Sequence, residues 1–193
     1  TAPSGTALIM VNEEGENCIV VAPGANGNLL PADIENIKNI SDAEIILMQL
    51  EIPMETISAV VKIGLSNKQK LIINPAPAQT LDDELLCDLF LITPNETEAT
   101  LLTGITVTDE ASAAIAADVL FKKGVLNVII TLGRQGAYFQ NSSFKLKIDA
   151  PVVQAVDTTA AGDTFNGALA VAITEKMDWE QAIKFAVKAA SIS

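Results

Sequence analysis

The chain has 193 residues, of which 49% are hydrophobic, and its formal net charge is −12. This composition predicts a globular domain with a sizeable core, and the acidic charge argues against nucleic acid, which proteins bind with clusters of Lys and Arg. The chain contains no histidine, which excludes Ser-His-Asp and Cys-His hydrolases and histidine-based zinc catalysis.

Two β-prone runs begin the chain, Ala7 to Val11 and Cys18 to Ala22. The polar segment between them, residues 12–17, predicts the turn of a hairpin. We expect residues 1–25 to form this small hairpin segment and residues 26–193 to form an α/β core.

The rest of the chain alternates short apolar runs with helical patterns. The apolar runs, typical of strands buried on both faces, are Ile45–Leu50, Leu71–Ile73, Leu89–Thr93 and Val128–Leu132. Helical spacing occupies Pro53–Ser66, Leu81–Cys87, Glu96–Thr103 and Glu110–Lys123. This alternation predicts right-handed βαβ units, and therefore an α/β fold with a mostly parallel sheet and helices on both faces. Ligands of such sheets bind beyond the carboxyl ends of the strands.

Polar residues follow two of these strands. Glu51 is either a solvated charge or a carboxylate that accepts hydrogen bonds from a polyol. Asn95 followed by Glu98 matches a capping box, in which each side chain binds the backbone amide of the other residue. The same pair also suits a second role, in which it organises Mg²⁺ and its waters near a triphosphate. The sequence leaves both sets of alternatives open.

Two glycines follow the fourth strand, in the segment Thr131-Leu132-Gly133-Arg134-Gln135-Gly136. They form either a plain turn or a loop that closes over a nucleotide. The chain contains neither a Walker A motif nor the Gly-x-Gly-x-x-Gly fingerprint of dinucleotide-binding folds.

The segment from Asp157 to Gly167 carries the strongest functional signal. Extended chain over Ser143 to Val156 precedes it, and apolar residues at helical spacing follow it, namely Phe165, Ala168, Leu169, Ala172 and Ile173. The segment is therefore expected to open a buried helix, whose unpaired N–H groups and dipole attract an anion.

The residues at this helix start suit phosphate chemistry. Ala160, Ala161 and Gly162 are small enough to let an anion approach the backbone closely. Asp163 then places a carboxylate beside the anion, as a base that deprotonates an attacking hydroxyl requires. A capped helix after a tight turn is the alternative interpretation.

Together these motifs resemble the PfkB/ribokinase family of carbohydrate kinases. Asp157 to Gly167 is similar to the C-terminal signature of that family, Thr93 to Glu98 to its Asn-x-x-Glu motif, and Thr131 to Gly136 to its nucleotide loop. Within the family, Met48-Gln49-Leu50-Glu51 and Asn74-Pro75-Ala76-Pro77 resemble the members that phosphorylate ribose. The resemblance spans essentially the whole chain, with the motifs in the same order.

The resemblance implies ATP-dependent, in-line transfer of a phosphoryl group to the primary hydroxyl of ribose, giving ribose 5-phosphate, with Asp163 as the base. The N–H groups of Ala160, Ala161 and Gly162 would hold the transferred phosphoryl group, and Glu51 would bind the sugar. Asn95 and Glu98 would position Mg·ATP, with Glu98 reaching Mg²⁺ through water. The residues implied to line the nucleotide site are Thr131, Leu132, Gly133, Arg134, Gln135 and Gly136.

Asp157 and Thr159 match positions that help to bind a monovalent cation, usually K⁺, in similar proteins; otherwise they shape the loop. The resemblance also implies that the hairpin of residues 1–25 is part of a lid and that a homodimer forms through its strands. The implied ligands are ribose and ATP, with no nucleic acid or membrane partner. Other candidates are a fructokinase-like or nucleoside kinase and a noncatalytic nucleotide-binding module.

The sequence also gives expectations about the cellular location of the protein and about whether the chain is a fragment. No apolar run approaches the ~20 residues of a membrane span, and Cys18 and Cys87 lack a paired spacing, so we expect a cytoplasmic protein with reduced thiols. The chain starts at Thr1, and an apolar helical stripe from Trp179 to Ala190 has no stop signal after it. We expect a fragment that lacks most of the sugar contacts of the family and is nearly inactive alone.

Overall fold

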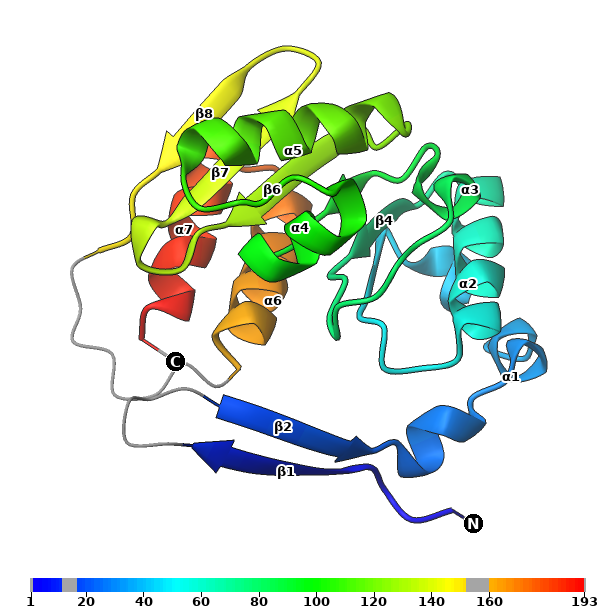
Figure 1. Ribbon diagram of the computed structural model, residues 1–193. Coiled ribbons are helices and arrows are strands. Elements are labelled where there is room, and N and C mark those ends of the chain that lie inside the picture. Colours follow the sequence, from blue (N-terminus) through cyan, green and yellow to red (C-terminus); the bar gives the residue numbers. More distant parts are fainter. Residues whose placement is uncertain (1, 12–16, 152–159, 193) are drawn as a thin grey trace.

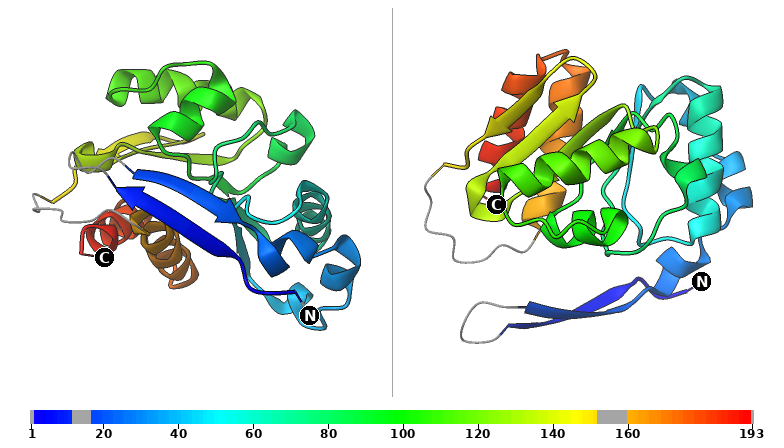
Figure 2. Two further views of the ribbon diagram at one scale, coloured as in Figure 1. Left: turned by 60° about the horizontal axis from the view of Figure 1, so that its bottom comes forward. Right: turned by 45° about the horizontal axis from the view of Figure 1, so that its top comes forward.

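The computed structural model describes residues 2–11, 17–151 and 160–192. These residues form a six-stranded sheet with helices on both faces, together with a separate two-stranded ribbon (Figures 1 and 2). The expected α/β architecture is confirmed. None of the helices in this part of the chain is long and apolar enough to cross a bilayer.

The main sheet has the strand order β3-β4-β5-β6-β7-β8. Its strands are β3 (Ile45–Met48), β4 (Lys70–Ile73), β5 (Leu91–Ile92), β6 (Asn127–Thr131), β7 (Ala137–Asn141) and β8 (Lys145–Ile148). β3 to β6 are parallel, β7 pairs antiparallel with β6, and β8 pairs antiparallel with β7. The sequence patterns missed β7, because Gln140 interrupts the apolar run by which the other strands were recognised.

Several boundaries differ from the predicted ones by one or two residues. β3 ends at Met48 rather than Leu50, since the Leu50 amide leaves the ladder and donates to the Ala76 carbonyl at 2.7 Å. The ladder of β5 is confined to two residues, although the Thr93 amide still donates to the Ile73 carbonyl at 3.0 Å. The strand ends that position the site are therefore short and closely tied to one another.

Helices cover both faces of the sheet (Figure 2). One face carries α2 (Met54–Ser66), α3 (Asp83–Leu86), α4 (Glu96–Thr103) and α5 (Glu110–Lys122). The other face carries α6 (Ala161–Thr174) and α7 (Trp179–Ala190). A short helix, α1 (Pro31–Glu35), packs beside α2, and 3₁₀ turns occupy Gly24–Asn28, Ile40–Asp42 and Gly133–Gln135.

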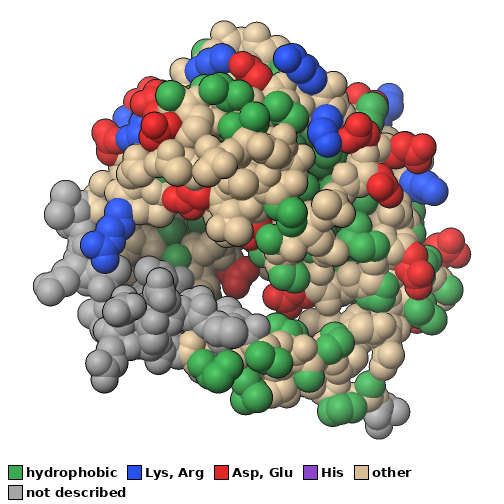
Figure 3. Space-filling view, viewed as in Figure 1, with side chains coloured by type: hydrophobic (Ala, Val, Ile, Leu, Met, Phe, Trp, Pro, Cys, Tyr) green, Lys and Arg blue, Asp and Glu red, His purple; other side chains and the backbone are tan. Residues whose placement is uncertain are grey.

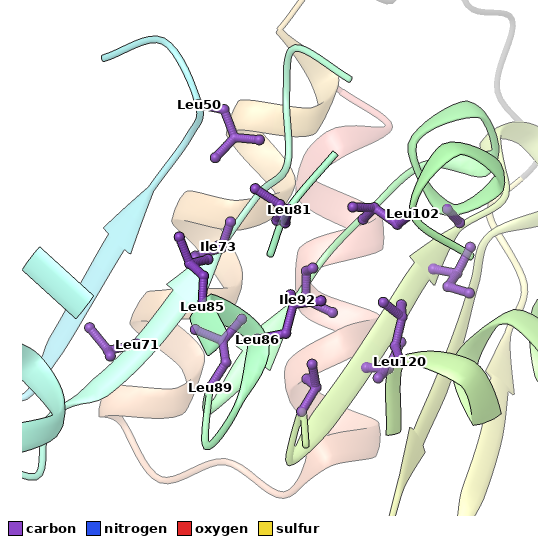
Figure 4. Close-up of a cluster of buried hydrophobic side chains, with 14 of the residues drawn as sticks. Leu50, Leu71, Ile73, Leu81, Leu85, Leu86, Leu89, Ile92, Leu102 and Leu120 are labelled. Atoms are coloured by element: carbon purple, nitrogen blue, oxygen red, sulfur yellow. The ribbon is translucent and has the colours of Figure 1, made fainter. Parts of the chain in front are cut away.

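Successive residues of the central strands alternate between two hydrophobic cores. Leu71 and Ile73 lie in the core formed with α2 to α5, part of which Figure 4 shows, whereas Ile72 lies in the core formed with α6 and α7. In β6, Val128 and Ile129 divide between the cores in the same way. Burial on both faces is the physical reason for the continuous apolar runs in these strands.

The ribbon consists of β1 (Thr6–Val11) and β2 (Asn17–Ala22), paired antiparallel from Thr6 opposite Ala22 to Val11 opposite Asn17. The predicted hairpin is confirmed, and its turn lies outside the described residues. Exposed apolar side chains of the ribbon are Leu8, Met10, Val20 and Val21, each more than half exposed. The ribbon lies across the end of the molecule where α6 begins (Figure 1).

Candidate active site

Three strand ends and one helix start meet at the edge of the sheet that faces the ribbon. β3, β4 and β5 end there because they are parallel, and α6 packs against β3 (Figure 1). Figure 3 shows a hollow between the ribbon and the α/β body, with acidic side chains inside it. The carboxyl ends of parallel strands are the usual place for a ligand in such folds.

The residue before α6 supplies no side-chain cap. Ala160 has the left-handed conformation, with φ 61°, and no side-chain hydrogen bond to the first turn. By contrast, α4, α5 and α7 are capped by the side chains of Asn95, Asp109 and Asp178. The first N–H groups of a helix have no partner within the helix, and no side chain of a described residue accepts from those at the start of α6, so they suit an anion.

Asp163 and Gly162 are both exposed in this first turn. A Cβ atom built on Gly162 would meet no described atom outside its own helix within 4 Å, so the described part of the chain leaves the backbone open there. The Asp163 carboxylate accepts a hydrogen bond from Gln49, which links the helix start to the end of β3; the Nε2–Oδ1 distance is 3.2 Å. The arrangement places a carboxylate beside the first N–H groups of α6, and the binding of an anion there stays a prediction.

Asn95 and Glu98 form the predicted capping box at the start of α4. Oδ1 of Asn95 accepts from the Glu98 amide at 2.8 Å, and Oε2 of Glu98 accepts from the Asn95 amide at 2.9 Å. Glu98 is only 5% exposed, and this burial raises the pKa of its carboxyl above the ordinary value, while the Asn95 hydrogen bond opposes the shift. Capping is therefore confirmed, and a role in positioning Mg²⁺ stays a prediction.

The segment from Thr131 to Gly136 forms a tight loop next to the start of α4. Gly133 to Gln135 make a 3₁₀ turn, and the Thr131 amide donates to the Pro94 carbonyl at 3.0 Å. Gln135 Nε2 donates to the Thr108 carbonyl at 3.2 Å, which fixes the loop to the approach to α5. Leu132 is buried, while Arg134 and Gln135 are exposed. The turn is confirmed, and contact with a nucleotide stays a prediction.

Glycine is required at the end of this loop. Gly136 has φ 94°, and a Cβ atom there would lie 1.9 Å from the Ile148 carbonyl oxygen. β8 thus approaches the loop too closely for any side chain at this position.

Glu51 is exposed and lies three residues after the end of β3. Its backbone neighbour Leu50 is tied to Ala76, so the segments Met48–Glu51 and Asn74–Pro77 lie together, as the rule for parallel strand ends predicts. Asp157 and Thr159, predicted to help bind a monovalent cation, lie outside the described residues.

Glu98 is the described residue proposed to contact Mg²⁺. Within the described ranges, no group of three or more His, Cys, Asp or Glu side chains could hold a metal directly. One oxygen of Glu98 is taken by the cap, which leaves Oε1 free of hydrogen bonds from the described part of the chain. Such a site suits Mg²⁺ that keeps its waters and takes its other oxygens from phosphates.

Sequence patterns missed three residues that organise this edge. Gln49 binds Asp163, and Thr93 and Asn166 bind each other with a 2.6 Å separation between Oγ1 and Oδ1. Each contact joins segments far apart in the chain, so a pattern of neighbouring residues cannot predict it. The one available signal was Asn166, a polar residue beside the apolar stripe of α6 that turns out to be 3% exposed.

Comparison with known proteins gives a consistent result. A family model described as "pfkB family carbohydrate kinase" matches residues 1–193. The ribokinase of Haemophilus influenzae is 44% identical over 191 residues, and the match covers 98% of this chain and 62% of that protein. The deoxyribokinase of Salmonella typhi is 36% identical over 192 residues, covering 98% of this chain and 63% of that protein.

A solved structure of Arabidopsis thaliana ribokinase, complexed with ribose and ATP, superimposes with a TM-score of 0.84. Its sequence is 32% identical, and the match covers 98% of this chain and 62% of that one. The chain thus spans slightly less than two thirds of the length of the relatives that it matches.

Proposed function

The chain belongs to the pfkB family of carbohydrate kinases, and from this we propose that the protein containing it transfers the γ-phosphoryl group of ATP to the primary hydroxyl of ribose. The product is ribose 5-phosphate. The observation that carries the proposal is the first turn of α6, which takes no side-chain cap from Ala160 and contains the exposed carboxylate of Asp163. A base and a set of anion donors are the two groups that this chemistry needs from the protein.

In the proposed mechanism, Asp163 accepts the proton of the sugar hydroxyl as that oxygen attacks the γ-phosphorus. The N–H groups of Ala160, Ala161 and Gly162 donate to the equatorial oxygens of the transferred group, where negative charge lies in the transition state. A Cβ atom built on Gly162 would meet no described atom outside its helix within 4 Å, which supports an approach of those oxygens to the backbone. Positioning and charge stabilisation therefore supply most of the rate enhancement.

The other predicted residues hold the reactants. Glu51 accepts hydrogen bonds from a ribose hydroxyl, and Thr131 to Gly136 line the nucleotide. Asn95 and Glu98 hold Mg·ATP, with Glu98 acting through water; when bound, Mg²⁺ neutralises phosphate charge. Asp157 and Thr159 help to bind K⁺.

Two observations support ribose as the proposed substrate. The chain is similar to ribokinases, and Glu51, the residue proposed to bind a sugar hydroxyl, follows β3 closely. The similarity to a deoxyribokinase makes 2-deoxyribose the second candidate. We also propose a homodimer formed through β1 and β2, supported by the exposed apolar side chains of this ribbon. A cytoplasmic location is part of the proposal, supported by the free, exposed thiol of Cys87.

The test is ADP release by the full-length protein with ribose, 2-deoxyribose, fructose or adenosine as acceptor. We expect the highest kcat/KM with ribose and a loss of about 10²- to 10⁴-fold in kcat for Asp163→Asn. Glu175→Gln, an exposed carboxylate just after the other end of α6, serves as the control and should leave kcat unchanged. A noncatalytic module would bind ATP but release no ADP with any acceptor, which would refute the proposal.

A further inference from the structure

A chain of buried polar contacts runs beneath the candidate active site, from the end of β3 to the first turn of α6. The Asn74 amide donates to the Met48 carbonyl at 2.9 Å, and Asn74 Nδ2 donates to the Thr93 carbonyl at 3.3 Å. The Thr93 hydroxyl donates to Asn166 Oδ1 at 2.6 Å, and Asn166 Nδ2 donates to the Gly162 carbonyl at 2.9 Å. Asn74, Thr93 and Asn166 are 7%, 2% and 3% exposed, so water does not compete for these contacts.

The partners of Asn166 fix the orientation of its amide. The Gly162 carbonyl can only accept, so the Nδ2 group must face it. Oδ1 is then left for the Thr93 hydroxyl, which must donate. Turning the amide around would face Oδ1 to a carbonyl and leave buried polar atoms unpaired, which is strongly unfavourable. The orientation of the Asn166 amide is therefore fixed, and the Thr93 hydroxyl donates to it at 2.6 Å, a shorter contact than its 3.5 Å distance to the Ile73 carbonyl.

We propose that Thr93 and Asn166 are positioning residues, which hold the first turn of α6 in register with the end of β5. The inference rests on the proposed function, in which the amides of this turn bind the transferred phosphoryl group. The Gly162 carbonyl and the Asp163 N–H belong to one planar peptide unit. By holding that carbonyl, Asn166 fixes the plane of the peptide unit that joins Gly162, a proposed phosphoryl donor, to Asp163, the proposed base.

The same contact connects the two halves of the site. Thr93 lies two residues before Asn95, whose cap with Glu98 begins α4. Its hydroxyl therefore joins the loop proposed to hold Mg·ATP to the turn proposed to hold the transferred group. Because misplacement by about 1 Å can reduce a rate 10²-fold, a direct link between these two segments has a catalytic consequence beyond stability.

Thr93→Val and Thr93→Ser in the full-length protein separate positioning from packing. Valine has the shape of threonine without the hydroxyl, and serine keeps the hydroxyl without the methyl group. We expect Thr93→Val to lower kcat about tenfold, with the KM for ATP and sugar changed less than about twofold, as for the loss of one buried hydrogen bond. Thr93→Ser should keep kcat within about twofold of wild type, although both variants should unfold at a lower temperature than wild type.

Asn166→Leu removes the other partner of the contact. We expect it to lower kcat at least as much as Thr93→Val, and the double variant Thr93→Val/Asn166→Leu to be no worse than Asn166→Leu alone, because both changes remove one shared interaction. Equal kcat values for Thr93→Val and Thr93→Ser, or fully additive effects in the double variant, would overturn the positioning role.

Hydrogen exchange supplies a measurement that does not depend on catalysis. In Thr93→Val, the amides of Thr164 to Asn166 should exchange about tenfold faster, while those of β6 keep the wild-type rates. Thr93→Ser should exchange like wild type. Unchanged exchange at the start of α6 in Thr93→Val contradicts the positioning role whatever the activity. If the wild-type protein phosphorylates no sugar, the proposed function fails, and this exchange comparison alone decides the positioning role.

Discussion

The side-chain amide of Gln49 donates to the carboxylate of Asp163, 114 residues away, with Nε2 and Oδ1 3.2 Å apart. Gln49 is held on both sides: the Met48 carbonyl accepts from the Asn74 amide at 2.9 Å, and the Leu50 amide donates to the Ala76 carbonyl at 2.7 Å. A donor fixed to the end of the sheet thus engages one oxygen of the proposed base. The other oxygen is left to receive the proton of a substrate.

Replacing Gln49 tests whether this contact aims the carboxylate. Gln49→Met keeps the length of the side chain but removes the donor, and we expect kcat to fall about two- to tenfold, the usual loss for one hydrogen bond. Gln49→Glu places a second negative charge beside Asp163 and should lower kcat further. Added salt should partly restore the glutamate variant and leave the methionine variant unchanged, because it screens only the charge repulsion. Wild-type kcat in both variants would mean that the contact has no catalytic role.

A substitution at Gly162 should affect the stability of α6 and the activity of the site in opposite directions. A methyl group at this position meets no described atom outside the helix and favours the helical conformation, so Gly162→Ala should raise the free energy of unfolding by about 0.5–1 kcal/mol. The same methyl group occupies the space proposed for the transferred phosphoryl oxygens, so kcat should fall at least about tenfold. Urea unfolding and ADP release measure the two effects.

Gly167 is the matched control for this substitution. It lies in the same helix, is also exposed, and has equally open space at its Cβ position. Gly167→Ala should therefore give a similar gain in stability with unchanged kcat. A more stable Gly162→Ala protein with full activity would show that no reactant approaches the backbone there.

The loop ending at Gly136 should tolerate no side chain. Gly136→Ala brings a methyl group into the Ile148 carbonyl and requires a backbone conformation that L-residues avoid, so we expect a loss of at least about 3 kcal/mol in unfolding free energy. Gly104→Ala has the same kind of positive φ, at 74°, but no atom within 4 Å, and should lose only about 1–2 kcal/mol. Similar losses in the two variants would contradict the close approach of β8.

Glu98 should make stability depend on pH. Because burial raises the pKa of this carboxyl above 4.5, the folded protein binds more protons than the unfolded chain in the window from 4.5 upward to the raised value. The contribution of Glu98 to the free energy of unfolding therefore decreases as the pH rises through that window. A glutamine side chain at this position still accepts from the Asn95 amide but does not titrate, so Glu98→Gln should remove this decrease.

Urea unfolding at several pH values measures the effect, with Glu110→Gln as control. Glu110 occupies the first turn of α5 as Glu98 does that of α4, but it is exposed, so this variant measures the effect of removing a carboxylate from a helix start without changing a buried group. An identical profile for wild type and Glu98→Gln would show that the buried carboxyl does not titrate in this range.

Short-range patterns in the sequence predicted the parts of this structure that depend on neighbouring residues. The Asn95–Glu98 cap follows from a spacing of three, and the parallel strands follow from apolar runs between helical patterns. The contacts of Gln49, Thr93 and Asn166 depend on which distant segments the sheet brings together. Short-range sequence patterns do not predict that pairing. The positions of Asp157 and Thr159 lie outside the described residues, so the cation site remains a prediction.

The division of the molecule into two cores has a consequence for how such a protein can diverge. Ala99 and Leu102 hold α4, with its proposed nucleotide contacts, in one core, whereas Phe165 and Leu169 hold the helix of the base in the other. Substitutions that accumulate in one core chiefly move one set of contacts, since the sheet separates them. A lineage can therefore change the packing beneath the proposed nucleotide contacts while the helix of the proposed base keeps its place, provided that the Thr93–Asn166 contact between the two is retained.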